Sequence, residues 1–136
     1  MDDIWRPTKF YRAFQGIGPK EEYGYEYRGL ILCHAGWGWP RTETVWSLVH
    51  AGSGGTFLRL TGTVATVFNV AGEIAECSDF TAYDLPEGWR QTDPDLPAKI
   101  GAICNAHPEA RPDTSFEGTM TDDDARAVIE ARERMP

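Results

Sequence analysis

The sequence predicts an α+β protein, with an antiparallel β-sheet or partly open barrel of five to six strands over about residues 8–83 and two C-terminal α-helices after it. Two observations predict this class. Short runs rich in aromatic and β-branched residues, joined by glycine-containing connections, fill the first part of the chain. After residue 84, apolar residues recur at helical spacing. The 136 residues suit one domain with a β-rich aromatic part at about 1–83 and an acidic helical part at about 84–136.

Six segments have the composition and alternation typical of strands. In the longest, Tyr23, Tyr25 and Tyr27 share one face, and Gly29 after them marks a bulge. Every second side chain of residues 63–70 also falls on one face. Short connections between the segments favour antiparallel pairing. The expected strands are residues 8–14, 23–35, 42–50, 56–61, 63–70 and 73–81.

Two helices are expected in the remainder of the chain. Asp95 is a candidate N-cap with Pro97 in the first turn, and the apolar spacing that follows ends at His107. The second helix begins with a capping box at residues 121–124, whose carboxylates suit the positive end of a helix dipole. It continues almost to Pro136.

The charge lies mostly in the second part of the chain. The net charge is −8. Residues 1–60 hold seven basic and six acidic residues, whereas residues 61–136 hold six basic and fifteen acidic residues. The acidity excludes a general nucleic-acid binder, which needs a basic surface. The absence of a long apolar stretch or secretory signal, and the odd count of three cysteines, predict a cytoplasmic protein that uses neither a membrane nor a disulfide framework.

A glycine-flanked segment carries the strongest candidate for a recognition surface. Trp37, Trp39 and Arg41 are residue types that dominate binding hot spots. The face formed by Tyr23, Tyr25 and Tyr27 extends such a surface if it is exposed. The alternative is that both tryptophans fold back and plug an open end of the sheet.

Arginines and aromatics of the expected strands form a second candidate site. Arg28, Arg41 and Arg59 lie in or beside strands that also carry Trp46 and Phe57. A guanidinium group pairs with phosphate or carboxylate, and an aromatic face stacks on a base. These residues therefore predict a pocket for a nucleotide-like anion, unless the arginines only cover strand edges.

Carboxylates of the second part form a candidate acidic surface that steers a basic partner. The alternative is a solvated face combined with helix capping. The residues proposed for this surface are Asp79, Asp84, Asp93, Asp95, Asp122 and Asp123.

The sequence contains weak signals for catalysis or metal binding. Cys104 and His107 form the only Cys-x-x-His pair, and zinc needs about four ligands. Cys33 and His34 are adjacent on a strand and therefore point to opposite faces. No metal or cofactor is expected, and the glycine-rich residues 52–55 are expected to be a hairpin connection rather than an anion cradle.

These observations favour a non-enzymatic binding protein, such as an inhibitor or antagonist from a mobile element, that occupies a protein partner stoichiometrically. It would use the aromatic and arginine residues as an anchor and the acidic surface for steering. The alternative is a binder that sequesters a small, nucleotide-like anion. A small enzyme with His34, His50 or His107 as a base is the third hypothesis. A homo-oligomer is compatible with all three.

Overall fold

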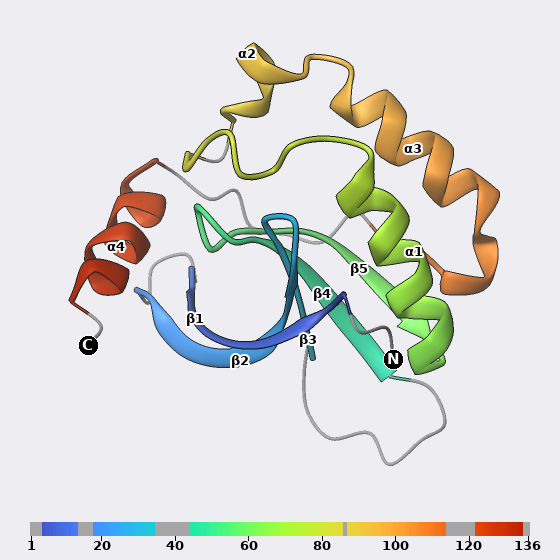
Figure 1. The fold of residues 1–136 in the computed structure, drawn as a ribbon, viewed down its shortest axis with the longest axis horizontal. Helices are drawn as coiled ribbons and strands as arrows, with labels where there is room; N and C mark the ends of the chain where they lie inside the picture. The colour runs from blue at the N-terminus through green and yellow to red at the C-terminus, as the bar shows by residue number, and fades with distance from the viewer. Residues whose placement is uncertain (1–3, 14–17, 35–43, 86, 114–121, 135–136) are drawn as a thin grey trace.

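A five-stranded antiparallel sheet and the helices that follow it confirm the α+β class (Figure 1). The computed structural model describes residues 4–13, 18–34, 44–85, 87–113 and 122–134. Each strand pairs with the next one along the chain, in the order β1-β2-β3-β4-β5. The strands are β1 (Arg6–Arg12), β2 (Lys20–Tyr27), β3 (Leu30–His34), β4 (Thr44–His50) and β5 (Thr56–Gly62).

Four α-helices and one short 3₁₀ helix lie in the described part of the chain after the sheet. The two helices predicted near residues 95–107 and 121–136 are present as α3 and α4. None of the described helices has the length and apolar character needed to cross a bilayer. The helices are α1 (Val64–Glu76), α2 (Trp89–Thr92), α3 (Leu96–Ala106), the 3₁₀ helix η1 (Pro108–Ala110) and α4 (Asp122–Glu133).

The strands predicted at residues 63–70 and 73–81 are wrong, because α1 occupies most of this stretch and the sheet ends at Gly62. The side chain of Thr63 caps the helix by accepting a hydrogen bond from the Thr66 amide at 3.3 Å. Alternate residues of 63–70 are apolar, but the buried positions continue with a helical period up to residue 75. The buried residues are Val67, Phe68, Val70, Ala71, Gly72, Ile74 and Ala75.

The main core lies between α1 and one face of the sheet, and α3 packs against α1 (Figure 1). Phe68 is its centre, because the rings of Trp5, Tyr25 and Trp46 each contact the Phe68 ring at centroid distances of 5.4 to 5.5 Å. Edge-on contacts of this kind add to the stabilisation from burial. The sheet contributes fully buried leucines to the same core, namely Leu30, Leu32, Leu48, Leu58 and Leu60.

The sheet curls because β2 bends between its two pairing partners. Residues 25–27 of β2 pair with β3, whereas the whole of β2 up to Glu26 pairs with β1. At the bend, a Cβ atom on Gly24 would lie 2.8 Å from the Ile31 side chain, so this position needs glycine. The β1–β2 ribbon therefore turns over the face of the sheet opposite α1 (Figure 1). At its end the Ala13 amide donates to the carbonyl of Gly54, in the β4–β5 turn, at 2.8 Å.

Arg12 fixes this curl from the inside. Its guanidinium donates to Ser47 Oγ on β4 at 2.9 Å and to Thr56 Oγ1 on β5 at 3.1 Å. It also pairs with Glu22 on β2 at 3.3 Å. The Arg12 side chain is buried, so these contacts replace the water that it loses. Burial beside this cluster raises the pKa of the Cys33 thiol to about 12, and the thiol is therefore unreactive at neutral pH.

We expect Arg12→Met to lower the free energy of unfolding by about 2–3 kcal/mol, because it leaves the hydroxyls of Ser47 and Thr56 and the carboxylate of Glu22 without their donor. Urea unfolding followed by tryptophan fluorescence measures this loss. Glu22→Gln is the control, since it keeps an acceptor near the guanidinium and is expected to cost less. Equal midpoints for the wild type and Arg12→Met would contradict this role of Arg12.

Candidate functional site

An open groove of about 430 Å³ lies where the start of β1 runs beside the β2–β3 hairpin. Its lining combines two arginines, one tyrosine and an exposed apolar side chain. Ile4, at its edge, is 43% exposed. The groove is lined by Ile4, Arg6, Pro7, Thr8, Glu26, Tyr27 and Arg28.

A tight turn places Arg28 at the groove. Arg28 and Gly29 are the two residues between the paired Tyr27 and Leu30, and both have positive φ, +54° and +86°. This is the pattern of a type I′ hairpin turn, in which arginine is an uncommon choice at the first position. A Cβ atom on Gly29 would lie 2.8 Å from the carbonyl carbon of Phe80. The expected bulge at Gly29 is therefore a hairpin turn packed against the chain after α1.

Helix α1 holds both hairpin side chains of the groove. Arg28 Nε donates to the carbonyl of Ala75 in the last turn of α1 at 3.1 Å, where a cation also complements the helix dipole. The Tyr27 hydroxyl donates to Glu76 at 2.8 Å, and this carboxylate raises the pKa of Tyr27. The Tyr27 ring also packs on Trp5, with centroids 5.4 Å apart. Tyr27 and Arg28 are thus fixed in position without a ligand.

The groove has unsatisfied positive charge. Within the described residues, neither Arg6 nor Arg28 forms an ion pair and Arg28 donates only from Nε, although its charge also lowers the pKa of Asp79. Glu26 is opposite Arg6 in the β1–β2 register but forms no ion pair with it. Two guanidinium groups facing one hollow beside an aromatic ring can hold an anionic group.

The other aromatic and arginine residues named from the sequence lie apart from this groove. Tyr23 is 73% exposed in the middle of β2, where it pairs with Lys9. Tyr25 and Trp46 pack on Phe68 in the core. Arg59 lies on β5, where its backbone bridges that of Asp113 at 2.9 Å in both directions. The single surface expected from these residues is therefore divided between two positions on β2, the core and the β5 edge.

Three predicted site residues lie outside the described part of the chain, and two residues of the groove were not predicted from the sequence. Trp37, Trp39 and Arg41 fall in residues 35–43, which the structure does not describe. Ile4 and Arg6 were not predicted as site residues, because they precede the expected first strand. Pro7 after Arg6 was the available signal, since proline without an N–H group favours an edge strand.

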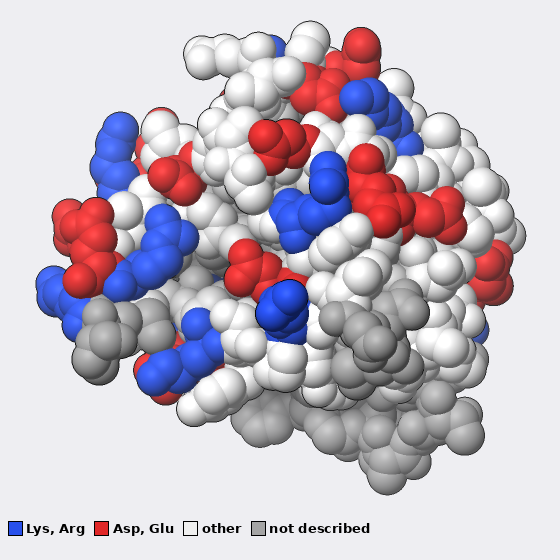
Figure 2. Space-filling view, in the orientation of Figure 1, with Lys and Arg blue, Asp and Glu red and all other residues white. Residues whose placement is uncertain are grey.

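The candidate acidic residues are interspersed with cations, as Figure 2 shows for one face of the molecule. Asp93 accepts hydrogen bonds from Ser78 at 2.6 Å and Lys99 at 2.9 Å, and these contacts lower the pKa of Asp93. The Thr81 side chain and amide bond to Asp79 and lower its pKa. Further ion pairs join Asp84 to Arg132 and Asp123 to Arg126. The other two candidates, Asp95 and Asp122, are exposed.

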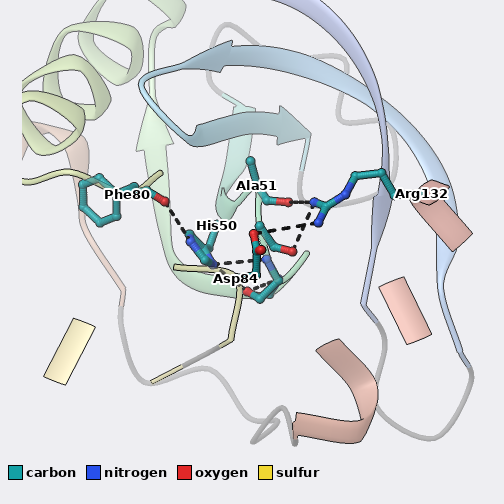
Figure 3. A network of polar contacts seen from close by, with 8 residues as sticks. His50, Ala51, Phe80, Asp84 and Arg132 are labelled. Carbon is teal, nitrogen blue, oxygen red and sulfur yellow. Dashed lines mark hydrogen bonds and ion pairs between the residues drawn. The ribbon is translucent and has the colours of Figure 1, made fainter. Parts of the chain in front are cut away.

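His50 belongs to a buried network that joins the β4–β5 turn to the chain after α1 (Figure 3). The carbonyl of Phe80 can only accept a hydrogen bond, so the His50 Nε2, 3.0 Å away, carries the proton. His50 Nδ1 then accepts from the Ser53 hydroxyl at 2.8 Å and the Ser53 amide at 3.2 Å. Burial lowers the pKa of His50 and keeps it neutral. Because Ser53 is only 1% exposed, this pair serves the turn rather than a solute.

Arg132 of α4 extends this network to the C-terminal helix. It donates to the carbonyls of Ala51 at 3.0 Å and Gly52 at 3.2 Å, and Asp84 lies 3.8 Å from it (Figure 3). Residues 52–55 therefore form the predicted hairpin connection, and α4 is anchored on the outside of it.

The other two histidines have different environments. The ring of His34 is exposed and stacks on Trp46, with centroids 4.1 Å apart. Both nitrogens of His107 face carboxylates, with Nε2 2.7 Å from Glu73 and Nδ1 2.8 Å from Glu109. The hydrogen bond with Glu109 and the charge of both carboxylates raise the pKa of His107. The His107 side chain ties the α3–η1 junction to α1 through Glu73.

Three cysteines are free, and Cys77 and Cys104 are half-buried. Among the described residues, no group of three or more His, Cys, Asp and Glu side chains could hold a metal ion.

Comparisons with protein-family models, curated proteins and solved structures find no match to this chain.

We expect the stabilisation from His107 to be lost as the pH rises. Its pKa is raised in the folded state, so the stabilisation is complete below the ordinary value of 6.5 and is lost as the pH rises through the folded value. Urea titrations of the wild type and His107→Gln between pH 5.5 and 9 measure the difference. The two proteins should converge at high pH, and a constant difference would contradict the ionic role.

We expect the opposite pH dependence for His50, because its pKa is lowered in the folded state. The stability of the wild type should decrease as the pH falls through 6.5 toward the folded value, and His50→Gln should lack this loss. At pH 7.5, His50→Ala should cost about 1–3 kcal/mol, because the buried Phe80 carbonyl and Ser53 amide lose their partner. His34→Ala is the exposed control. Equal effects of the two alanine variants would contradict the buried network.

Proposed function

We propose that this chain is a non-enzymatic binding protein that occupies a protein partner stoichiometrically, as an inhibitor or antagonist does. The observation that supports this proposal is the groove lined by Arg6, Tyr27 and Arg28. Tyrosine and arginine are enriched in the few residues that supply most of the binding energy at interfaces. The groove supplies both types on a hairpin that α1 already holds in place.

Preorganisation favours this use of the groove. A side chain that is fixed before binding loses little rotamer entropy when the partner arrives. Tyr27 is fixed by Trp5 and Glu76, and Arg28 by Ala75. The exposed Ile4 adds apolar area next to the charged groups. The segment with Trp37 and Trp39 remains a second candidate anchor, and the exposed carboxylates a candidate steering surface in a cytoplasmic setting.

A small, nucleotide-like anion is the second candidate ligand. The groove volume of about 430 Å³ lies within the range of small-molecule sites. Such sites enclose most of their ligand, whereas this groove lies open at the edge of a sheet. An extended part of a larger partner therefore fits it better than a free small molecule.

Affinity capture with the full chain tests the proposed function. The captured protein is identified by mass spectrometry, produced separately and titrated by calorimetry. We expect one partner per chain and a loss of at least about tenfold in affinity for Arg6→Glu, which places a carboxylate next to groups that Arg6 would bind. Lys20→Glu is the matched control, since it makes the same charge change at the other end of the β1–β2 ribbon.

Three results of this experiment would count against the proposal. One is the absence of any saturable one-to-one partner. Another is an equal loss of affinity in Arg6→Glu and Lys20→Glu. The third is a nucleotide released from the heat-denatured protein and lost in Arg6→Glu, which would favour the second candidate. Trp37→Ala and Trp39→Ala, titrated in parallel, measure how much residues 35–43 contribute to the affinity for the partner.

A further inference from the structure

The geometry points to an acidic peptide segment as the occupant of the groove, in which one or two carboxylates pair with Arg6 and Arg28 and a neighbouring apolar side chain packs on Ile4 and Tyr27. This inference names the chemistry of the partner and rests on the proposed function.

The groove holds two cations that form no ion pair within the described residues of a chain rich in carboxylates. Carboxylates outnumber cations, 21 to 13, and many of the described cations form an ion pair with a carboxylate. Arg6 and Arg28 share one hollow and form no ion pair among the described residues, although Glu26 lines the same hollow and the charge of Arg28 lowers the pKa of Asp79. The paired cations are Lys9, Arg12, Arg90, Lys99, Arg126 and Arg132.

Arg28 is oriented for a carboxylate. Its Nε is bound to the carbonyl of Ala75 at 3.1 Å, which restricts rotation of the guanidinium plane. Nη1 and Nη2 form a fork that fits the two oxygens of a carboxylate. Because Nε already donates to the Ala75 carbonyl, the ligand needs to supply acceptor atoms only for Nη1 and Nη2.

The apolar neighbours define the second part of the ligand. Ile4 is 43% exposed and lies with the Tyr27 ring in the lining of the groove. Pro7 lacks an N–H group, so a partner strand cannot extend the sheet by pairing with a donor at this position. Recognition at the groove therefore relies on side chains, and an acidic residue beside an apolar one is complementary to it.

A peptide fits better than a nucleic acid. The net charge of −8 and the carboxylate of Glu26 in the lining repel a backbone with a phosphate at every nucleotide. A short segment with one or two carboxylates is repelled much less and can place them on the two arginines.

The test is a titration of the isotope-labelled full chain with two short peptides, followed by two-dimensional NMR. The probes are the acetylated and amidated peptide Gly-Glu-Leu-Glu-Gly and its counterpart with glutamine in place of glutamate. We expect saturable shifts at the amides of Arg6, Thr8 and Arg28 and at the Arg28 side-chain N–H. Binding of the glutamine peptide should be at least about fivefold weaker, as the loss of a charge pair predicts.

Variants and competitors complete the test. Arg6→Glu should abolish the shifts, whereas Lys20→Glu should retain them. The Arg6 side chain is exposed and forms no hydrogen bond or ion pair among the described residues, and the dispersion of the NMR spectrum verifies the fold. Adenosine diphosphate and a ten-nucleotide oligothymidine, titrated at equal concentrations, represent the other anionic ligands.

Each result decides the inference. Glutamate-dependent binding that requires Arg6 supports it. Equal binding of both peptides, no binding of either, or stronger groove shifts with the nucleotide or oligothymidine would overturn it. If a captured partner still depends on Arg6 while the glutamate peptide does not bind, the proposed function stands and only the acidic occupant is wrong. If capture is independent of Arg6, the proposed function fails on its own test.

Discussion

Arg12 reaches from the first strand across the inside of the curled sheet to hydroxyl groups on the fourth and fifth strands. Three residue pairs between β2 and β3, the Ala13–Gly54 hydrogen bond and the packing of Phe10 on Ile31, Cys33 and Val49 also join the β1–β2 ribbon to the rest of the sheet, but Arg12 provides its buried polar link. The bend at Gly24 permits the curl, and the charge of Arg12 makes it specific, because a buried guanidinium needs acceptors in definite places. The start of β1, where Ile4 and Arg6 border the groove, is positioned by the same ribbon.

The described helices and strands show which local sequence patterns were sufficient to predict secondary structure. The strands expected at 8–14, 42–50 and 56–61 correspond to β1, β4 and β5, whereas the single strand expected at 23–35 is divided by the Arg28–Gly29 turn into β2 and β3. Residues 63–70 were predicted as a strand because a window of eight residues is too short to distinguish the two-residue period of a strand from the 3.6-residue period of a helix. The Thr63 cap and the apolar residues up to Ala75 contain the information that decides for a helix. A longer window would have distinguished the two periods.

The groove was only partly predictable for a different reason. Tyr27 and Arg28 are adjacent in the sequence, and their residue types marked them as candidates. Arg6 joins them through the register that places it opposite Glu26, a pairing between residues 20 positions apart. No local pattern encodes such a register before the hairpin forms. Trp46 shows the converse, because its residue type suits a binding site but its position on the inner face of β4 places it against Phe68.

The acidity of the chain acquires a definite role when it is considered together with the groove. Charges separated by more than about 8 Å are largely screened at physiological ionic strength. In the proposed complex, a polyanion would meet many exposed carboxylates of this chain, whereas one bound carboxylate would interact mainly with Arg6 and Arg28. Repulsion increases with the number of charges on the ligand, but the attraction at the groove saturates at two. If the groove binds the acidic segment proposed above, a negative chain with Arg6 and Arg28 unpaired among its described residues would select isolated carboxylates over dense polyanions, which a uniformly basic surface cannot do.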